Sequence, residues 1–273
     1  MTDFLARDWK VLNDNVRADL VVVRIGHWNV LADQLAESGG FQPEPPSLAW
    51  PERSQRLLAI IDAAGPFDAL SLVECDHFAD FWEPMMRARG LVGWHARKTI
   101  HRWDHGVALF YRSDKFVVGQ LRLFQDGVAA ISAKLQLRHK PAVHFSLTTM
   151  HLKAKPDGED TRDTQIANIG REMEIHDFNG IVVGDFNAIV TDNCVATLRR
   201  MWLVRPDFWL PWTTWKQRQD TVVRRAIDHV LMRNVFVTAF LDVPNDDDVT
   251  AAGLLPGTRY ASDHLLLAFD CAL

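Results

Sequence analysis

The sequence predicts an α/β fold, a single domain in which two layers of mostly antiparallel β-sheet are flanked by helices. Short apolar runs alternate with helical patterns up to residue 112, whereas residues 116–152 carry three consecutive strand patterns with little helix between them. No repeat, low-complexity tract or linker divides the 273 residues. The consecutive strands indicate antiparallel hairpins and argue against a purely parallel, doubly wound sheet.

The N-terminal half is predicted to open with a buried strand at residues 20–30 (LVVVRIGHWNV), because its β-branched run is continuous and ends in a polar turn. A helix follows at residues 51–64, with proline at its first position and an apolar stripe, and Gly65-Pro66 ends it. The next three elements are predicted as strand, helix and strand, at residues 69–74, 78–89 and 107–112.

In the C-terminal half, the three strand patterns are followed by a helical pattern at residues 160–178 and a short buried strand at residues 181–184. A second helix is predicted at residues 193–202. The chain is expected to close with two strands, an acidic loop and a last strand, at residues 226–232, 235–242, 245–248 and 265–272.

The composition is that of an ordinary globular protein, with 48% hydrophobic and 24% charged residues. A net charge of −5 lacks the basic footprint that attraction to a polyanion usually leaves, so we expect a small substrate or a local nucleic-acid contact. Cys75, Cys194 and Cys271 are widely spaced without a zinc-binding pattern, which indicates a reducing setting. With no apolar stretch of membrane-spanning length and no leader pattern, we expect a soluble, unprocessed, cytoplasmic monomer that does not contact a membrane.

Polar residues stand where the predicted strands end, which is where a sheet scaffold commonly carries functional groups. They are Asn29, Glu74, His151, Asp185, Asn187, Asp228, Asp263 and His264. Taken singly, each has a structural explanation: Asp185 and Asn187 can bond their own backbone in a turn, and a lone carboxylate or histidine is commonly solvated or packed.

Taken together, these residues combine hard oxygen ligands with histidines. Mg²⁺ prefers one or two carboxylates plus waters and substrate phosphate oxygens, which this set can offer. A zinc site would need several His or Cys ligands in close sequence spacing, and the chain does not offer them. The set therefore predicts a Mg²⁺ site, with Mn²⁺ as an alternative ion.

Eight sequence blocks carry a resemblance to a known family. They are residues 28–32 (WNVLA), 72–78 (LVECDHF), 106–111 (GVALFY), 150–155 (MHLKAK), 184–188 (GDFNA), 213–216 (TTWK), 226–230 (AIDHV) and 260–265 (YASDHL). In this order they resemble the endonuclease/exonuclease/phosphatase superfamily, and within it the branch of nocturnin and the poly(A)-shortening deadenylases. The resemblance runs from about residue 21 to the C-terminus.

The resemblance implies a four-layered α/β sandwich of the deoxyribonuclease I type, with two mixed, mostly antiparallel β-sheets packed face to face and helices outside. It implies one catalytic domain at residues 21–273, preceded by an N-terminal extension at residues 1–20. The implied activity is Mg²⁺-dependent hydrolysis of a nucleotide or nucleic-acid phosphoester without a covalent intermediate.

The resemblance also implies residue roles. Glu74 is expected to be the principal Mg²⁺ ligand, assisted by Asn29 and, directly or through water, by Asp263. The remaining roles are catalytic: Asp185 and Asn187 orient and help deprotonate the attacking water, His264 held by Asp228 acts as general base or binds phosphoryl oxygens, and His151 stabilises charge developing at the phosphate.

Two positions depart from the family pattern. Val73 stands where members commonly carry Gln, so a hydrogen bond around Glu74 is expected to be made differently or to be missing. His105-Gly106 stands in place of Asp-Gly, so either His105 or the preceding Asp104 is expected to supply a substrate contact.

Substrate-binding candidates lie outside this core. Lys153, Lys155, Arg162 and Lys216 can hold a second phosphate, and Trp215 can stack on a base within a segment that also holds Trp202, Trp209 and Trp212. The acidic net charge favours a 2′-phosphatase of NADP(H) over a 3′→5′ exoribonuclease acting on poly(A). A DNA-repair-type endonuclease and a non-catalytic binding module with the same fold are further alternatives.

Overall fold

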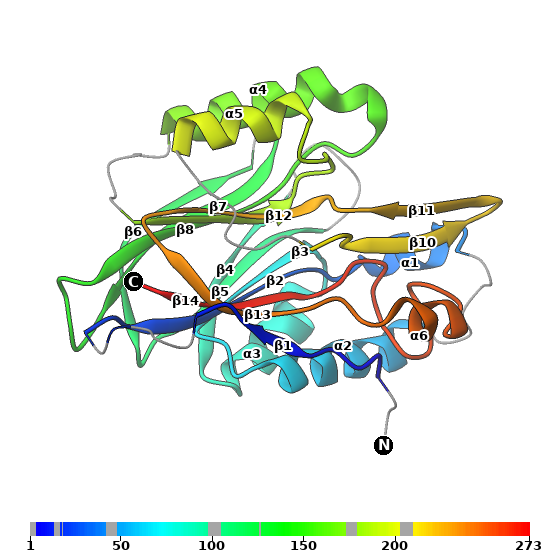
Figure 1. Cartoon of the computed structure of the whole chain (residues 1–273), viewed down its shortest axis with the longest axis horizontal. Helices are drawn as coiled ribbons and strands as arrows, with labels where there is room; N and C mark the ends of the chain where they lie inside the picture. The colour runs from blue at the N-terminus through cyan, green and yellow to red at the C-terminus, as the bar shows by residue number, and fades with distance from the viewer. Residues whose placement is uncertain are drawn as a thin grey trace.

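The computed structural model of the chain describes residues 4–13, 17, 19–41, 48–97, 105–125, 127–172, 179–202 and 210–273. Two β-sheets pack face to face, and helices cover the outer face of each (Figure 1). One sheet has seven strands, in the spatial order β1 (Trp9–Val11), β13 (Phe236–Leu241), β14 (Leu267–Ala272), β2 (Val22–Asn29), β3 (Ala69–Cys75), β5 (Gly106–Arg112) and β4 (Leu91–Arg97). The other has five, in the order β12 (Asp228–Arg233), β9 (Gly180–Asp185), β8 (His144–His151), β7 (Ala129–Leu137) and β6 (Phe116–Phe124).

The helices form the two outer layers (Figure 1). The seven-stranded sheet is covered by α2 (Trp50–Ala64), the π-helical turn η1 (Phe78–Trp82) and α3 (Glu83–Arg87), and the five-stranded sheet by α4 (Glu159–Glu172) and α5 (Asn193–Trp202). This arrangement confirms the predicted four-layered α/β sandwich.

Strand alternation distributes the core between the layers. In β2, Val23 and Ile25 point into the core between the two sheets, whereas Trp28 points outward into the core under α2. The side chains of Leu57 and Ile61 on α2 complete that second core. The inner face of β2 therefore points toward the five-stranded sheet, and residues at odd positions along it, up to Asn29, face that sheet.

Within the described residues, one pair of strands in each sheet runs parallel, β2 with β3 and β8 with β9, while the other pairings are antiparallel. The carboxyl ends of two parallel neighbours lie at the same edge of their sheet, the usual location of a ligand site. Contacts of β2 and β3 with β8 and β9 bring the two parallel pairs together.

Several predicted elements need correction. The strand β4, the small α1 (Asp33–Ser38) and the hairpin of β10 (Thr214–Arg218) and β11 (Thr221–Arg225) were not expected. The predicted acidic loop at residues 245–248 instead begins α6 (Asp246–Ala251), because the Asn245 side chain caps it by accepting from the N–H of Asp247 at 2.8 Å. The predicted helix at residues 160–178 is described only as far as Glu172.

The N-terminal residues contact the sheet directly. β1 pairs antiparallel with β13, and the half-buried Arg7 donates through its guanidinium to the carbonyl oxygens of Leu241, Asp242 and Leu266 at 3.1, 2.6 and 2.6 Å. These bonds attach the segment to the edge of the domain.

Candidate active site

The carboxyl ends of the two parallel strand pairs bring together four of the residues singled out in the sequence. Asn29 ends β2 and Glu74 lies at the end of β3, while His151 ends β8 and Asp185 ends β9. Because the two sheets face each other, these side chains meet between the layers.

Three of these residues, Glu74, His151 and Asp185, form what we call the Glu74 cluster. The Nε2 atom of His151 lies 3.9 Å from Glu74 Oε1 and 3.8 Å from Asp185 Oδ2. One ligand atom from each side chain lies within 4.8 Å of the other two. The side chains of His151 and Asp185 are buried, and that of Glu74 is 14% exposed, so the cluster is reached from the Glu74 side.

Backbone geometry directs the carboxylate of Glu74 into this cluster. Glu74 has a left-handed φ of 54°, and the register between β3 and β5 shifts between Val73 and Cys75. A bulge of this kind turns a side chain away from its expected face. Asn187, two residues after Asp185, also has a left-handed φ of 50°. Such conformations cost energy in non-glycine residues and commonly concentrate at functional sites.

Asn29 bridges the two carboxylates of the cluster. Its amide nitrogen donates to Glu74 Oε1 and to Asp185 Oδ2, both at 3.0 Å, while its oxygen accepts from the N–H of Leu31. The nitrogen and not the oxygen thus faces the cluster. The N–H of Ala32 also donates to Glu74 Oε2 at 3.3 Å, so two donors contact Glu74 although Val73 replaces the family's Gln.

The donor set of the Glu74 cluster fits a divalent cation. Burial and the neighbouring Asp228 carboxylate raise the pKa of Asp185 to about 7, and Glu74 adds to the same effect. A bound cation would compensate this accumulation of negative charge. Two carboxylates with room for further oxygen ligands suit Mg²⁺ or Mn²⁺, and a single histidine does not make a structural zinc site.

A second group, Asp228 and His264, is termed the Asp228–His264 pair. Asp228 Oδ2 accepts from His264 Nδ1 at 2.8 Å and from the Thr213 hydroxyl at 2.6 Å. His264 Nε2 lies 3.9 Å from Asp185 Oδ2, which connects the pair to the Glu74 cluster. The side chains of Asp185, Asp228 and His264 are all buried.

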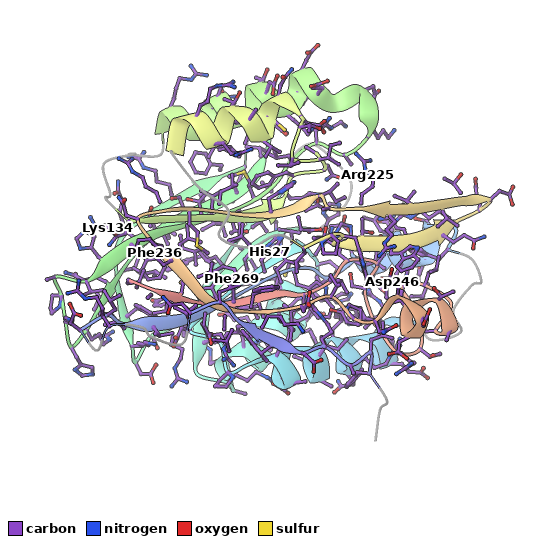
Figure 2. The ribbon with its side chains drawn as sticks, viewed as in Figure 1. His27, Lys134, Arg225, Phe236, Asp246 and Phe269 are labelled. Carbon is purple, nitrogen blue, oxygen red and sulfur yellow. The ribbon has the colours of Figure 1, made fainter. Side chains whose placement is uncertain are left out.

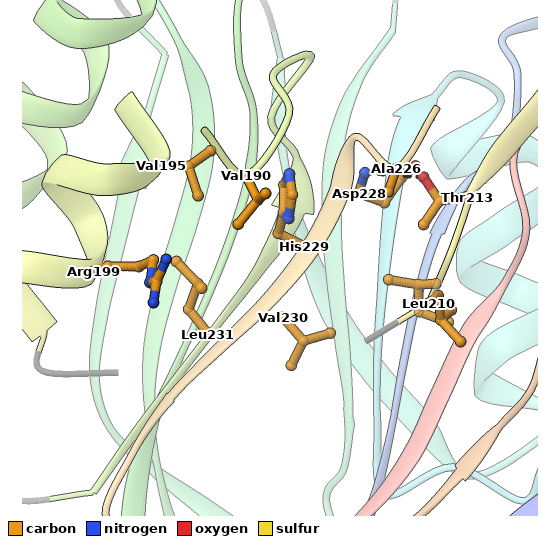
Figure 3. A pocket seen from close by; sticks show the side chains of 11 residues that line it. Val190, Val195, Arg199, Leu210, Thr213, Ala226, Asp228, His229, Val230 and Leu231 are labelled. Atoms are coloured by element: carbon orange, nitrogen blue, oxygen red, sulfur yellow. Dashed lines mark hydrogen bonds between the residues drawn. The ribbon is translucent and has the colours of Figure 1, made fainter. Parts of the chain in front are cut away.

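Figure 3 shows how β12 separates two neighbouring residues: Asp228 lies beside Thr213 on one side of the strand, and His229 lies on the other with Val190 and Val195. The His229 ring bonds the carbonyl oxygen of Ala188 at 2.8 Å. The cavity drawn there has a volume of about 30 Å³, too small for a nucleotide.

Charges in the pair stabilise each other. Burial alone would raise the pKa of Asp228, but the charge and hydrogen bond of His264 hold it well below the usual range. Burial alone would lower the pKa of His264, but the carboxylates of Asp228, Asp263 and Asp185 raise it to about 9. The pair is therefore an imidazolium and a carboxylate at neutral pH.

Asp263, expected to assist the metal, lies next to two cations. Its Oδ2 atom accepts from Lys216 Nζ at 2.5 Å and from the Arg218 guanidinium at 3.3 Å, both on β10. Burial opposes ionisation of Asp263, but Lys216, His264 and Arg218 hold its pKa below the usual range. Neither of the two ligand groups within the described residues includes Asp263.

Asn187 contacts both sides of the loop after β9. Its N–H donates to Asp185 Oδ1 at 2.9 Å, and its amide nitrogen donates to the Leu152 carbonyl at 3.2 Å. These bonds orient Asp185 and the chain that follows His151.

Arg162 has a different environment from the other basic candidates. It is 3% exposed, and its guanidinium donates to the carbonyl oxygens of Lys153 and Lys155 at 3.1 and 2.9 Å. Lys155 has φ 81° and ψ 148°, a conformation that is essentially restricted to glycine. Arg162 thus holds a strained loop that presents Lys153 and the exposed Lys155 beside His151.

Trp215 lies on the hairpin and is already stacked. The guanidinium of Arg224 lies 4.1 Å from its ring centroid, and the buried Trp212 ring contacts it edge-on at 5.5 Å. The side chains of Trp202 and Trp209 lie outside the described residues, as does Asp104.

A cavity of about 400 Å³ borders the Glu74 cluster. Its lining includes Ala32, whose N–H contacts Glu74, and His105, whose ring centroid lies 6.4 Å from that of His151. Gly106 follows His105 because a Cβ there would lie 2.2 Å from the Ala96 carbonyl oxygen. The remaining polar lining is largely acidic, and it consists of Asp33, Asp76 and Asp80 with His77 and Gln34. Burial raises the pKa of Asp76 to about 6.

Two supporting residues were not recognised in the sequence. Thr213 belongs to the motif block at residues 213–216, but the sequence did not indicate that its hydroxyl bonds Asp228, because that contact depends on how the β10–β11 hairpin folds. Arg53 is fully buried and donates to the carbonyl oxygens of Val30 and Leu31 at 2.9 and 2.7 Å, which fixes the turn that leads to Ala32. An arginine within the apolar stripe of a helix is the one signal that could have indicated a buried role.

Comparisons with known proteins agree with this geometry. Residues 26–264 match the Endonuclease/Exonuclease/phosphatase family. Nocturnin of Rattus norvegicus is 28% identical to this chain, and the match covers 97% of this chain and 69% of that protein. The Ccr4 3′-5′-exoribonuclease subunit of Neurospora crassa is 27% identical, and the match covers 45% of this chain and 17% of that protein.

Two solved structures have the same fold. The human Nocturnin catalytic domain with a bound sulfate anion has a TM-score of 0.76 and 24% identity, with 97% of each chain covered. ANGEL2, a 2′,3′-cyclic phosphatase in complex with adenosine-2′,3′-vanadate, has a TM-score of 0.77 and 16% identity, with 98% of this chain and 99% of its own covered. By its family match over residues 26–264, this chain belongs to the Endonuclease/Exonuclease/phosphatase family and is a phosphoester hydrolase.

Proposed function

We propose that the chain is a Mg²⁺-dependent hydrolase of nucleotide phosphoesters, with the 2′-phosphate of NADP(H) as the favoured substrate. The observation that carries this proposal is the contact of the Glu74 cluster with the Asp228–His264 pair, at 3.9 Å between Asp185 Oδ2 and His264 Nε2. A cation site and a buried imidazolium would thus face the same phosphate.

Asp185 is proposed to orient the attacking water and accept its proton. The bonds from Asn29 and from the N–H of Asn187 hold its two oxygens in fixed directions. Water attack at phosphorus then breaks the bond from phosphorus to the ester oxygen, with no covalent enzyme intermediate.

His264 is proposed to bind the phosphoryl oxygens as an imidazolium. With a pKa of about 9 it carries its proton at neutral pH, which favours this role over that of general base. Asp228 fixes the ring through Nδ1 and leaves Nε2 directed toward Asp185. His151 is proposed to stabilise charge on the opposite side of the phosphate.

Glu74 and Asp185 are proposed to hold the cation, with Asn29 orienting both carboxylates. A bound Mg²⁺ supplies positive charge to the phosphoryl and leaving oxygens. Asp263 is proposed to act through Lys216, because the ion pair at 2.5 Å sets the position of that ammonium group near His264.

The acidic cavity favours a small substrate. A polynucleotide that crossed it would bring successive phosphates close to Asp33, Asp76 and Asp80, and like charges repel. A nucleotide with one phosphate at the cluster could instead direct an uncharged part into the cavity, while Lys153 and Lys155 meet a second phosphate.

The second candidate is a 3′→5′ exoribonuclease acting on poly(A), in line with the partial similarity to the Ccr4 exoribonuclease subunit. The hairpin supplies the specific observation, because the guanidinium of Arg224, which also pairs with Asp246, stacks on Trp215, and Arg225 next to it is exposed. Surfaces of this kind stack successive bases of single strands.

The test compares phosphate release from NADPH with shortening of a labelled poly(A) oligonucleotide, each in Mg²⁺ and in EDTA. Phosphate release from NADPH in Mg²⁺ alone, with intact RNA, is the expected result. Stepwise RNA shortening with inert NADPH would establish the second candidate instead.

Matched variants make this test specific. Glu74→Gln removes one charge at the cluster, and Glu83→Gln makes the same change on α3, where Glu83 forms an exposed ion pair with Arg87. Only Glu74→Gln should abolish turnover. Equal turnover in both variants would contradict the assignment of the site.

A further inference from the structure

A chain of buried polar side chains leads from the core to the Asp228–His264 pair. His27 on β2, Ser71 on β3 and Thr149 on β8 are each fully buried between the sheets. Figure 2 labels His27 in the layer between the two sheets. The two preceding inward positions of β2, Val23 and Ile25, are apolar, so His27 interrupts an otherwise apolar surface.

The contacts of this chain end at Asp228. His27 Nδ1 lies 2.9 Å from Ser71 Oγ, and Ser71 in turn contacts the hydroxyl of Thr149. On the other side of the ring, His27 Nε2 lies 3.6 Å from Asp228 Oδ1. Neither Nε2 nor Oδ1 has a hydrogen-bond partner within the described part of the chain, and both atoms are buried.

Chemistry fixes the direction of these contacts. The Asp228 carboxylate can only accept hydrogen bonds, so His27 Nε2 must carry the hydrogen that faces it. In the neutral ring Nδ1 is then an acceptor, which the hydroxyl of Ser71 satisfies, and Ser71 can accept from Thr149. A gap of 3.6 Å leaves no space for an intervening water, so a small shift of the ring completes the bond.

Both oxygens of Asp228 therefore face a donor, Oδ2 within hydrogen-bond distance and Oδ1 across a gap of 3.6 Å. Oδ2 receives His264 and Thr213, whereas Oδ1 faces only His27 within the described residues. Without a donor at Oδ1, the carboxylate can rotate about its terminal bond and weaken the bond to His264. A partner of this kind, one step removed from the reacting group, usually sets the orientation of a catalytic histidine.

We propose that His27 is a positioning residue of the active site, which faces Asp228 so that His264 keeps the orientation required at the phosphate. This inference rests on the proposed function insofar as the Asp228–His264 pair serves phosphoester hydrolysis. Within the described residues, the polar contacts of His27 are with Ser71 and Asp228 and not with the Glu74 cluster. Its effect on the active site therefore passes through Asp228.

The kinetic test uses two substitutions at His27 in two backgrounds, with whichever of NADPH and the poly(A) oligonucleotide the unchanged protein hydrolyses. His27→Phe should lower kcat by about 10- to 100-fold, the usual effect of a lost outer partner, with KM unchanged. His27→Gln, whose amide can donate from the position of Nε2, should retain kcat within about threefold if that donor is the property required.

In the Asp228→Asn background, His27→Phe should cause no further fall in kcat, because the two residues act as a unit. A purely structural role would instead lower kcat by the same factor in both backgrounds, and that result would overturn the proposal. Thr148→Val is the matched control, since Thr148 is a fully buried hydroxyl next to Thr149 on β8, where strand alternation turns it to the other face; it bonds Ser132 at 2.9 Å and lies outside this chain of contacts.

An arm without catalysis separates this inference from the proposed function. Nitrogen-15 NMR of the histidine rings reports the His264 Nδ1 proton that Asp228 accepts. In His27→Gln and Thr148→Val that signal should keep its position, and in Ser71→Ala and His27→Phe it should shift or broaden. An unchanged His264 signal in both of the latter variants would contradict the inference, whereas inert NADPH and inert RNA would contradict only the proposed function.

Discussion

The Glu74 cluster and the Asp228–His264 pair lie side by side but differ in how their charges are satisfied. In the pair, each oxygen of Asp228 faces a donor, and the pKa of Asp228 lies well below the usual range. In the cluster, two carboxylates share the amide of Asn29, and burial with neighbouring charge raises the pKa of Asp185 to about 7. The charges of the pair compensate each other, whereas the cluster carries an excess of negative charge that a cation would compensate.

Backbone strain also distinguishes the Glu74 cluster from the Asp228–His264 pair. Glu74 and Asn187, at or beside the cluster, have left-handed φ, as does Lys155 in the loop after His151, whereas Asp228 and His264 do not. Strain of this kind persists only where the surrounding structure enforces it. The strained residues thus lie in the half of the site that we propose to receive the cation and substrate.

The largest expected effect comes from removing the charge that the cation requires. Glu74→Gln should lower kcat/KM by about 10³-fold, because charge stabilisation by a metal amounts to several kcal/mol and each 1.36 kcal/mol is tenfold in rate. In EDTA, the same variant should raise the free energy of unfolding, since it removes a like charge near Asp185. Steady-state kinetics and urea denaturation measure the two effects. A Glu74→Gln variant that loses both activity and stability would contradict the view that the Glu74 cluster carries uncompensated negative charge.

The second prediction concerns pH and the pair. The folded pKa of His264, about 9, exceeds its ordinary value of 6.5, so its stabilisation is complete below pH 6.5 and is lost as pH rises through 9. In EDTA, the free energy of unfolding should fall by roughly 2 to 3 kcal/mol between pH 7 and 9, because one pKa unit corresponds to 1.36 kcal/mol.

Asp228→Asn should remove most of that slope, since it takes away the charge that holds the proton on His264. Asp185, with its pKa of about 7, also makes the free energy of unfolding fall as pH rises, but mainly below pH 7. The change between pH 7 and 9 therefore reports mainly on His264. Burial raises the pKa of Cys75 and Cys271, and their effect is common to both proteins. An equal slope in Asp228→Asn would show that the pair does not set the protonation of His264.

The smallest effect tests the strain beside His151. Lys155→Gly and Lys155→Ala remove the same charge, but only glycine adopts φ 81° and ψ 148° without a steric penalty. The glycine variant should be about 1 kcal/mol more stable than the alanine variant, and urea denaturation resolves that difference. An alanine variant of equal or greater stability would argue that Arg162 does not hold the loop in a strained state.

The sequence predicted the strand ends because apolar runs that stop at a polar residue are a local signal. Glu74, Asp185 and Asn29 each follow such a run, and the structure brings them within hydrogen-bonding distance of one another through Asn29. The missed strand β4 (LVGWHAR) is mostly half buried and shows no clean apolar run or alternation, and the strands of the missed hairpin, β10 (TWKQR) and β11 (TVVRR), are rich in polar residues and mostly half buried or exposed.

Pairings between distant residues could not be predicted. Asp263 and Lys216 are 47 positions apart and meet only because the hairpin folds over the loop of His264. Arg162 was predicted from the sequence to contact the substrate, yet its guanidinium donates to the backbone carbonyl oxygens of Lys153 and Lys155 in the preceding loop. His27 could have been suspected, since strand alternation puts it on the face of Asn29, but its link to Asp228 depends on the packing of two sheets.

Calorimetric titration of Mg²⁺, with Mn²⁺ in parallel, into the unchanged protein and into Glu74→Gln tests the central claim most directly. We expect Mg²⁺ to bind more tightly at pH 8 than at pH 6, because the cation must displace the proton that Asp185 holds below about pH 7, and we expect this binding to be lost in Glu74→Gln. Equal binding by both proteins, or no binding by either, would contradict a cation site at the Glu74 cluster.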